Sequence, residues 1–366
     1  MSSPTCAIVS FRLGLTDGVS VVAATWADIL ADLGFTVVTV AGEGPVDRLV
    51  PPLAIGAPAP PGGSGPERND ELDAAVADAL ADADLVVVEN LCTIPLNLPA
   101  ALSVGRVLAG RRAVFHHHDP PWQRTEWAHV DALPLRGCDG AGDAGVDGSW
   151  RHVTINALTA AEFADRGIPA TCIYNGFALP PPPDPERRAG LRARLGVADA
   201  EVLVAHPVRA IPRKRVDRAL ALCEELGATY WLWGPAEFGF GAELDRLVAH
   251  ARCRVLRTPP PDADAGYDAC DLVVFPSDWE GFGNPPVEAA LRGIPAAVGP
   301  YLIGAELASL GFSWLDAGNP RAVAAALDAP DPDAQARNRA LAERWFGVER
   351  VADDLSALLH GAGWLP

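Results

Sequence analysis

The alternation of short apolar runs with amphipathic segments constrains this chain most strongly, and it continues from end to end. A run such as Leu85–Glu89 is typical of a strand buried on both faces of a sheet. Strands of this kind separated by helices predict parallel sheets covered by helices. The strands that we expect are Ala7–Phe11, Thr36–Val40, Leu85–Glu89, Ala113–His117, Val153–Asn156, Thr171–Tyr174, Val202–His206, Tyr230–Gly234, Leu272–Pro276 and Ala296–Val298. The expected helices are Val19–Leu33, Glu71–Ala81, Leu98–Leu108, Thr159–Arg166, Pro185–Leu195, Lys214–Leu226, Ala242–Ala251, Pro285–Gly293 and Arg344–Leu359.

A proline run at 179–183 divides this pattern into two parts and is typical of an extended linker. A length of 366 residues also suits two domains better than one. We therefore expect two α/β domains, each with a doubly wound parallel sheet. The first comprises residues 1–178 and the second comprises residues 179–343.

The charge balance limits the class of ligand. The chain has 29 basic and 47 acidic residues, a net charge of −18, which argues against nucleic acid as a partner because phosphate backbones select basic surfaces. An anionic ligand would need a local cationic site. Lys214 is the only lysine, so its position is informative.

Cysteine usage and the N-terminus indicate a cytoplasmic location. The seven cysteines are scattered and include no C-x-x-C pair, as expected for reduced, buried thiols. Met1–Val9 has no basic segment before its apolar run, so it does not resemble a signal peptide. No stretch of about 20 apolar residues predicts a membrane span.

Three patterns resemble binding motifs but are interpreted otherwise. Gly140–Gly145 has the spacing G-x-G-x-x-G, yet it neither follows an expected strand nor opens a helix, so we interpret it as a loop. Asp82–Asp84 and Asp262–Asp264 are expected to be turn or cap residues. In His116–His118 successive side chains alternate between faces of a strand, so the three cannot converge on one ion. We expect no metal and no cofactor.

Two segments are suited to bind an anion. Gly14–Gly18 follows the first strand and opens a helix, whose N-terminus offers free N–H groups and partial positive charge. Val208–Arg215 follows a strand of the second domain and holds four basic residues within seven positions. Arginine and lysine together suit a phosphate group.

Two further segments complete the set. In Trp279–Glu288 the glycines permit close backbone approach, Asn284 is a good helix N-cap, and Pro285 suits a first turn. Glu280 and Glu288 flank that helix N-terminus, where carboxylates could accept hydrogen bonds from sugar hydroxyls. Ile173–Gly176 ends in an Asn-Gly turn just before the linker.

Jointly these residues resemble the retaining glycosyltransferases of family 4, which have the GT-B fold, in which two Rossmann-like domains face each other across a cleft. The resemblance covers nearly the whole chain, and it implies that a C-terminal helix at about 344–366 crosses back to complete the first Rossmann-like domain. It rests on the glycine loop, a His-Asp pair at a strand end, the Asn-Gly hinge, Arg209-x4-Lys214, and Glu280-Gly-Phe-Gly283 with Glu288 completing E-x7-E.

The resemblance implies roles at matching positions. Arg209 and Lys214 would neutralise the donor diphosphate, Glu280 would bind hydroxyls of the donor sugar, and Glu288 would hold the ribose. His118 would lie near the sugar, although His116 or His117 could be the true equivalent. Further donor-side candidates are Gly18, Gly234, Gly281, Phe282, Gly283 and Asn284, and the acceptor-side candidates are Arg12, Asp17, His116 and Asp119.

The implied reaction moves a hexose from a UDP-glucose-like or GDP-mannose-like donor to a hydroxyl of a small-molecule, glycan or lipid-linked acceptor. The anomeric configuration would be retained, and the donor phosphate would take the acceptor proton without a metal. Trp122 and Trp127, in the long segment Asp119–Ser149, could stack on a carbohydrate acceptor or simply pack within the protein. A homodimer is left open, and membrane contact is at most peripheral, through the arginines of the helix Pro185–Leu195.

The sequence departs from the family pattern at two places. Pro285 and Pro286 follow Asn284 and have no N–H to offer a phosphate. Thr16-Asp17-Gly18 replaces a double glycine, which puts a carboxylate near the expected acceptor entrance. Three alternative functions remain: a nucleotide-sugar epimerase or hydrolase on the same fold, a pyridoxal-phosphate phosphorylase using Lys214, and a two-lobed sugar-binding protein without catalysis.

Overall fold

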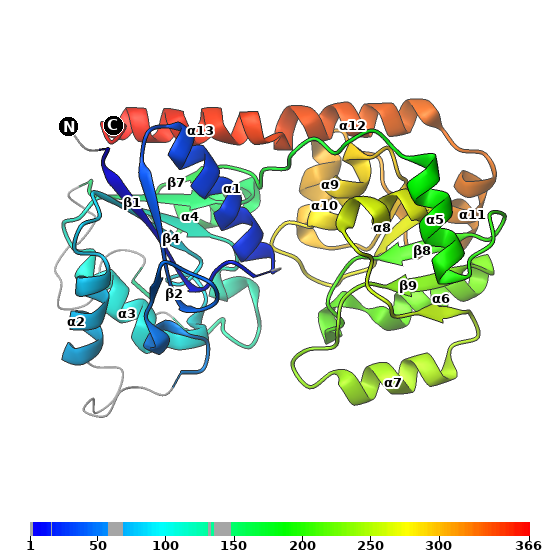
Figure 1. Cartoon of the computed structure of the whole chain (residues 1–366), viewed down its shortest axis with the longest axis horizontal. Helices are drawn as coiled ribbons and strands as arrows, with labels where there is room; N and C mark the ends of the chain where they lie inside the picture. The colour runs from blue at the N-terminus through cyan, green and yellow to red at the C-terminus, as the bar shows by residue number, and fades with distance from the viewer. Residues whose placement is uncertain (1–2, 16, 58–68, 131–132, 135–147) are drawn as a thin grey trace. The chain divides into compact units, whose positions relative to one another are not determined.

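The computed structural model describes residues 3–15, 17–57, 69–130, 133–134 and 148–366. The chain forms two compact units, Met1–Gly176 with Val348–Pro366 and Phe177–Gly347, which we call the N-terminal and C-terminal units. Each unit holds one parallel sheet with helices on both sides (Figure 1). This confirms the predicted fold class of two doubly wound α/β domains.

The N-terminal unit has a seven-stranded sheet in the order β3-β2-β1-β4-β5-β6-β7, and its described pairings are parallel. Its strands are β1 Thr5–Arg12, β2 Thr36–Glu43, β3 Arg48–Leu49, β4 Leu85–Glu89, β5 Ala113–His117, β6 Trp150–Thr154 and β7 Ala170–Cys172. Its helices are α1 Gly18–Asp32, α2 Asp70–Ala79, α3 Leu98–Val107, α4 Ala157–Asp165 and α13 Val348–Ala362.

The sheet of the N-terminal unit is buried on both faces. In β1, Ala7 and Val9 belong to the core cluster that α2 and α3 complete, whereas Cys6 and Ile8 belong to the cluster that α1 and α13 complete. Successive side chains of a strand point to opposite faces, so a strand between two apolar layers favours apolar residues at consecutive positions. This double burial explains apolar runs such as Cys6–Val9 in β1 and Leu85–Val88 in β4.

The last helical segment differs from its prediction. The sequence predicts one helix from Arg344, but α12 (Pro332–Phe346) ends before Gly347 and α13 starts at Val348. Gly347 has an extended backbone, with φ −61° and ψ 142°, which interrupts the helix. Beyond it, α13 lies beside α1 (Figure 1) and buries Val351 and Leu355 in the same core cluster as Trp26.

The C-terminal unit has a six-stranded parallel sheet in the order β10-β9-β8-β11-β12-β13. Its strands are β8 Leu203–His206, β9 Thr229–Leu232, β10 Val255–Leu256, β11 Leu272–Phe275, β12 Ala296–Val298 and β13 Leu315–Asp316. Its helices are α5 Pro185–Leu195, α6 Val216–Leu226, α7 Gly241–His250, α8 Ala263–Ala269, α9 Asn284–Leu291, α10 Leu302–Ser309, α11 Pro320–Asp328 and α12 Pro332–Phe346.

Three of the four arginines of α5 make contacts within the C-terminal unit. Arg187 pairs with Asp268, and Arg188 pairs with Asp271. Arg192 is 1% exposed and donates hydrogen bonds to backbone carbonyls, including that of Ala269 at 2.9 Å. These guanidinium groups therefore tie α5 to α8 and its following turn. Within the described chain, no helix combines the length and the apolar character that crossing a membrane requires.

Candidate active site

Each sheet has a switch point at which the strand order reverses, and open α/β sheets bind ligands outside the carboxyl ends of the strands there. In the N-terminal unit the switch point lies between β1 and β4, and in the C-terminal unit it lies between β8 and β11. The segments after β1, β8 and β11 carry most of the predicted site residues. Each unit is described below by itself.

The segment after β8 is shaped by a proline and a strained arginine. Pro212 opens a 3₁₀ turn, Pro212–Lys214, where its fixed φ is favourable. Arg215 then takes a left-handed φ of 51° and caps α6, a conformation that costs a non-glycine residue energy. Its guanidinium group pairs with Asp217 at 2.6 Å and with Asp278 at 3.1 Å. The helix predicted from Lys214 therefore begins two residues later, at Val216.

Lys214 and Glu280 meet although 66 residues separate them in the chain. Lys214 Nζ lies 2.6 Å from Glu280 Oε1, and Arg213 Nη1 lies 2.7 Å from Glu280 Oε2. Both carboxylate oxygens are thus paired with cations, and the Glu280 side chain is only 8% exposed. Lys214 Nζ also lies 4.8 Å from the centre of the Phe275 ring, a cation–π distance.

The pKa values of this cluster follow from burial and mutual charge. Burial would raise the pKa of Glu280, but the charges of Lys214 and Arg213 outweigh it and hold the pKa at about 2. Burial lowers the pKa of Lys214 to about 8 against the opposing charge of Glu280. Burial, and then the charge of Lys214, lowers the pKa of His206 to about 3. At neutral pH the cluster therefore holds two cations and one anion.

Arg209 lies on the same loop and is held by a carboxylate from the loop after β9. Its Nη1 is 2.7 Å from Glu237 Oε2, and both side chains are about one-third exposed. Backbone hydrogen bonds from Ala210 N to Pro235 O and from Glu237 N to Ala210 O join the two loops. A Cβ at Gly234 would lie 2.5 Å from Val208 O, so Gly234 allows the loops to approach.

The loop after β11 differs from its prediction at the start of α9. Gly283, with φ 107°, is the N-cap, and Asn284 is the first helical residue. The cap position requires a left-handed backbone, which glycine adopts at little cost, so the predicted capping by Asn284 is wrong. Pro285 and Pro286 stand in the first turn and offer no N–H. This reduces the backbone donors at the helix N-terminus, as the sequence predicts.

Glu288 lies on α9, and Phe282 lies on the loop that precedes this helix. Glu288 Oε2 accepts a hydrogen bond from Tyr267 Oη at 2.7 Å, and burial raises the pKa of Glu288. The Phe282 side chain is buried against the Phe346 ring, with centroids 5.2 Å apart. Any donor contact by Phe282 therefore rests on its backbone.

Gly283 faces the buried hydroxyl of Tyr301, which has no hydrogen-bond partner among the described residues. A Cβ at position 283 would lie 2.2 Å from Tyr301 Oη. We predict that Gly283→Ala lowers the free energy of unfolding by at least about 2 kcal/mol, since it adds a steric clash to a left-handed backbone. Chemical denaturation measures the loss.

Two variants isolate the clash. Gly293, just after α9, also has a positive φ, 69°, but a Cβ there would meet nothing within 4 Å, so Gly293→Ala reports backbone strain alone, about 1 kcal/mol. The double variant Gly283→Ala/Tyr301→Phe should recover part of the lost stability. Equal losses in Gly283→Ala and Gly293→Ala would contradict the account.

In the N-terminal unit, Asp17 is committed to the start of α1. It is the N-cap, its Oδ1 accepts a hydrogen bond from Ser20 N at 3.3 Å, and its Oδ2 lies 3.3 Å from Arg12 Nε. The Asp17 carboxylate therefore caps the helix while it pairs with Arg12. A Cβ at Gly18 would meet nothing within 4 Å, so the space beside Gly18 is open. Thr16 lies outside the described residues.

The histidine run follows the alternation that the sequence predicts. His116 and His118 share one face and both contact Glu89, whereas His117 turns to the other face and contacts Thr93 and His152. The three histidines therefore do not converge. His116 and His118 do, however, join Glu89 in a group whose potential ligand atoms lie within 4.8 Å of one another.

Of these histidines, His118 keeps some exposure. Its side chain is 6% exposed, against 0% for His116, which stacks on Trp26 with ring centroids 4.1 Å apart. Asp119 accepts a hydrogen bond from Asn90 Nδ2 at 3.2 Å and pairs with Arg124, also at 3.2 Å. His118 is therefore the histidine best placed to meet a ligand.

The pair formed by the buried His117 and the partly buried His152 makes the stability of the N-terminal unit depend on pH. Their rings are joined by a hydrogen bond of 2.9 Å between His117 Nε2 and His152 Nδ1. Burial lowers the pKa of His152 to about 4 and that of His117 well below its usual value. Both residues therefore stay neutral in the folded unit, whereas both take up a proton near pH 6.5 in the unfolded chain.

The unfolded state thus binds more protons below pH 6.5, and stability falls as the pH drops from 6.5 towards 4. Each histidine contributes about 1.4 kcal/mol per pH unit. Urea unfolding at pH 7.5, 6.5, 5.5 and 4.5 measures this slope in the wild type and in His152→Gln. The variant is expected to lose less stability over the same window; parallel slopes would contradict the assignment.

The remaining sequence patterns have structural explanations where they are described. Asp82 pairs with Arg48 at 2.6 Å, and Asp84 accepts a hydrogen bond from Thr5 N. Asp262 caps α8, and Asp264 pairs with Arg292. The six described cysteines are free thiols. Gly140–Gly145 lies outside the described residues.

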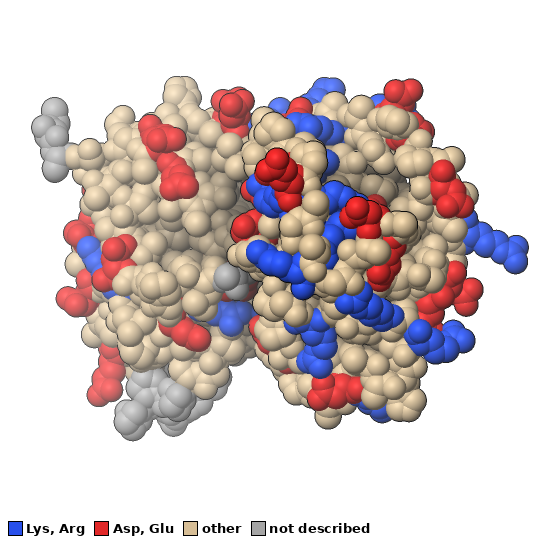
Figure 2. All heavy atoms as spheres, turned by 45° about the vertical axis from the view of Figure 1, so that its right-hand side comes forward, with Lys and Arg blue, Asp and Glu red and all other residues tan. Residues whose placement is uncertain are grey.

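Charge differs between the two units. Residues 177–347 hold 18 of the 29 basic residues and 23 of the 47 acidic residues, so the excess of negative charge is concentrated on the N-terminal unit. Figure 2 shows basic side chains interspersed with acidic ones over the C-terminal unit, which this view brings forward. The unit that carries Lys214 is therefore much closer to neutral than the chain as a whole.

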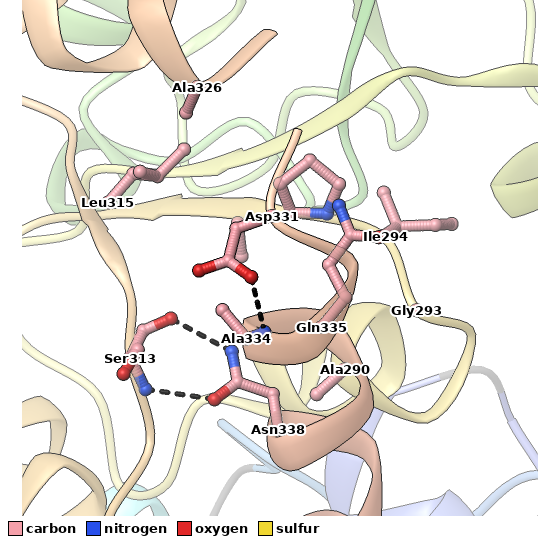
Figure 3. Close-up of a pocket in the computed structure, with 12 residues that line it drawn as sticks. Ala290, Gly293, Ile294, Ser313, Leu315, Ala326, Asp331, Ala334, Gln335 and Asn338 are labelled. Carbon is pink, nitrogen blue, oxygen red and sulfur yellow. Dashed lines mark hydrogen bonds between the residues drawn. The ribbon is translucent and has the colours of Figure 1, made fainter. Parts of the chain in front are cut away.

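Two hollows of the C-terminal unit lie apart from the Lys214 cluster. One, of about 80 Å³, lies beside Gly293, and its polar groups are already paired, as in the double hydrogen bond between Asn338 and Ser313 (Figure 3). It is smaller than typical ligand pockets of roughly 300–1,000 Å³. The other, of about 400 Å³, lies over α6 and is not lined by Lys214 or Glu280.

Several residues of these clusters were not predicted from the sequence. They are Glu89 and Asn90 after β4, Glu237 beside Arg209, Tyr267 beside Glu288, and Tyr301 beside Gly283. Glu89 could have been suspected from the sequence, because it is a carboxylate at the end of an apolar strand. A buried carboxylate needs a hydrogen-bonding or charged partner.

Comparisons with known proteins show that this chain shares its fold with solved glycosyltransferases. The structure of HepE from Anabaena in complex with UDP-glucose is similar with a TM-score of 0.74 and 20% identity, over 98% of this chain and 99% of HepE. Sucrose-phosphate synthase from Thermosynechococcus elongatus gives 0.67 and 16%, over 98% of each chain. WaaG, a glycosyltransferase involved in lipopolysaccharide biosynthesis, gives 0.66 and 17%, over 95% of this chain and 98% of WaaG.

The comparison by sequence covers a smaller part of the chain than the comparison by fold. No curated protein matches this chain. One family model matches residues 191–339, which lie in the C-terminal unit with Arg209, Lys214, Glu280 and Glu288. The chain thus has the GT-B fold, and the greater part of its C-terminal unit matches the family of glycosyl transferases group 1.

Proposed function

We propose that this protein is a retaining glycosyltransferase that moves a hexose from a nucleotide-diphosphate sugar to a hydroxyl acceptor. The observation that carries the proposal is the buried cluster of Lys214, Arg213 and Glu280 at the switch point of the C-terminal sheet. It lies inside the segment that matches the glycosyl transferase family. UDP-glucose in the HepE complex supports a nucleotide-sugar donor.

The donor would engage this cluster through its charged and polar groups. Lys214 carries three N–H donors, of which Glu280 engages one, so the remaining two can reach a diphosphate. Arg209 would add a second cation once the diphosphate competes with Glu237. Glu280 would accept hydrogen bonds from sugar hydroxyls, and Glu288 from the ribose.

In the proposed reaction no protein side chain forms a covalent bond to the substrate. In the transition state the sugar gains positive charge and the leaving diphosphate gains negative charge. The Lys214 cation, held in place by Glu280, would stabilise the leaving group with little reorganisation, the condition under which preorganised charge is most effective. Arg209 would add its charge after it exchanges Glu237 for the diphosphate. The acceptor hydroxyl would give its proton to the donor phosphate on the same face of the sugar. We propose that these side chains replace a metal ion.

The N-terminal unit would supply the acceptor side. Gly18, with open space beside it, would let the loop after β1 approach the reacting centre, and His118 would contact the sugar. Arg12, Asp17 and Asp119 would define the acceptor entrance, although Asp17 and Asp119 already hold structural partners. The identity of the hexose, the nucleotide base and the acceptor are matters for experiment.

A direct assay incubates the protein with UDP-glucose, UDP-galactose, GDP-mannose, ADP-glucose or dTDP-glucose and a set of sugar, polyol and lipid-linked acceptors. Proton NMR follows the anomeric signal, and each reaction is run with and without EDTA. The expected result is a new α-glycoside from an α-linked donor, in both buffers.

The other outcomes each remove one part of the proposal. A β-glycoside would contradict retention, and loss of transfer in EDTA would contradict a metal-free reaction. Nucleotide release without a glycoside would indicate a hydrolase or epimerase.

A further inference from the structure

The carboxylate of Glu89, at the carboxyl end of β4, lies between two imidazole rings. His116 Nδ1 is 3.0 Å from Glu89 Oε1, and His118 Nε2 is 2.8 Å from Glu89 Oε2. The parallel register of β4 and β5 pairs Glu89 with His116, and strand alternation puts His118 on the same face. The Glu89 side chain has no exposed surface.

The charge of Glu89 decides where the ring protons are. Burial would raise its pKa, but the neighbouring histidines hold it at about 2, so Glu89 is ionised at neutral pH. An ionised carboxylate only accepts hydrogen bonds. Both rings must therefore donate, His116 through Nδ1–H and His118 through Nε2–H.

His116 is consistent with this arrangement. Burial lowers its pKa, so its ring is neutral, and with the proton on Nδ1 its Nε2 is a bare acceptor. His116 Nε2 is indeed buried without a hydrogen-bond partner among the described residues. Burying an unpaired nitrogen lone pair beside the Trp26 ring costs less free energy than burying an unpaired N–H of a charged ring there.

The backbone of His118 is held from the same strand end. Asn90 has a left-handed φ of 58°, and its Oδ1 accepts hydrogen bonds from His118 N at 3.1 Å and from Asp119 N at 3.2 Å. Glu89 thus holds the ring of His118 and Asn90 holds its main chain. Residues with a left-handed backbone that the surrounding contacts hold in place cluster at functional sites.

We propose that Glu89 is a positioning residue, which keeps His118 in its Nε2–H tautomer and leaves Nδ1 as a hydrogen-bond acceptor for a hydroxyl of the substrate. Within the described part of the chain, Nδ1 of His118 makes no hydrogen bond. The hydrogen bond between His118 Nε2 and Glu89 is a feature of the structure, whereas the identification of that hydroxyl as one of the donor sugar rests on the proposed function.

The tautomer is measured by long-range ¹H–¹⁵N NMR of ¹⁵N-histidine-labelled protein at pH 7.5, with the His118 signals assigned by their absence in His118→Gln. We expect a neutral ring protonated on Nε2. A ring protonated on Nδ1 would overturn the proposal. So would stoichiometric bound zinc whose removal shifts the His118 signals, because a metal would then occupy the place of the protons.

The role is measured with Glu89→Gln and Glu89→Leu. Glutamine replaces one acceptor by a donor, and leucine removes both acceptors, so neither holds both rings as found. We expect kcat to fall about 10- to 100-fold, by analogy with the loss of the hydrogen-bond partner of a metal-bound histidine, with the donor Kd changed less than about threefold. The His118 ¹⁵N shifts should change in at least one variant.

Thr93→Val is the matched control. It breaks the buried hydrogen bond of 2.6 Å to His117, on the opposite face of the same strand, and leaves Glu89 and His118 in place. We expect wild-type His118 shifts and a kcat within about threefold of wild type. Wild-type kcat and His118 shifts in both Glu89 variants, or an equal fall of kcat in Thr93→Val, would refute the positioning role.

The readouts separate the two proposals. Absence of transfer activity in the wild-type protein would count against the proposed function and leave the tautomer measurement valid. An active enzyme in which the His118 ring is protonated on Nδ1 would refute the positioning role of Glu89 and leave the proposed function intact.

Discussion

Lys214→Ala is expected to lower kcat/KM about 100- to 1,000-fold while the protein stays folded. The loss follows from removal of a preorganised cation from the leaving diphosphate, worth about 3–4 kcal/mol of activation free energy. The fold survives because Glu280 keeps its second cation, Arg213 at 2.7 Å. Steady-state kinetics and chemical denaturation measure the two effects.

The alkaline limb of the pH profile provides an independent check on Lys214. Burial lowers its pKa to about 8, and a lysine loses its charge above its pKa, so kcat/KM of the wild type should fall above pH 8. Lys214→Arg keeps its charge at that pH, so any residual activity of this variant should lack that fall. Full activity in Lys214→Ala would refute the assignment.

Glu280→Ala is expected to abolish transfer and also to destabilise the C-terminal unit. If Glu280 only bound the donor sugar, the fold of this variant would stay intact. The structure indicates otherwise, because removal of Glu280 leaves the largely buried Lys214 and the neighbouring Arg213 without their carboxylate. Breaking a buried ion pair on one side costs about 3–5 kcal/mol, and this loss is measured by urea unfolding.

Glu280→Gln separates catalysis from folding. It keeps the size of the side chain and one acceptor for Lys214, so we expect a smaller loss of stability than in Glu280→Ala but still at least a 100-fold fall in kcat/KM, the size of effect reported when one transition-state hydrogen-bond partner is removed. A stable Glu280→Ala protein would contradict the ion-pair geometry. An active Glu280→Gln protein would contradict the role in binding the donor sugar.

The fold was predictable from sequence where strands are apolar on both sides. Leu85–Glu89, Ala113–His117 and Ala296–Val298 have the predicted bounds, because a strand between two layers of helices leaves a continuous apolar run. The edge strands β3, β10 and β13 were missed. Each has two residues, too few to show any periodicity, and their pairing depends on neighbours distant in sequence.

The site residues were predictable where a charged side chain follows the end of a strand closely in the sequence. Lys214 and Glu280 were identified individually, and the structure brings them to 2.6 Å. Glu89 was missed because its partners lie 27 and 29 residues away, so their contact depends on the register of β4 against β5. The helix break at Gly347 and the N-cap of α9 at Gly283 likewise depend on backbone conformations. Glycine permits these conformations, but its presence in a sequence does not predict them.

Isothermal titration calorimetry of UDP and UDP-glucose with the wild type and Lys214→Ala tests the central claim most directly. The claim is that Lys214 and its neighbours form a cationic diphosphate site in a chain of net charge −18. We expect the wild type to bind with a Kd in the micromolar range, which corresponds to about −8 kcal/mol, and the variant to bind at least tenfold more weakly. No heat with UDP, GDP, ADP or dTDP or their sugar conjugates, or equal affinity in both proteins, would contradict the account.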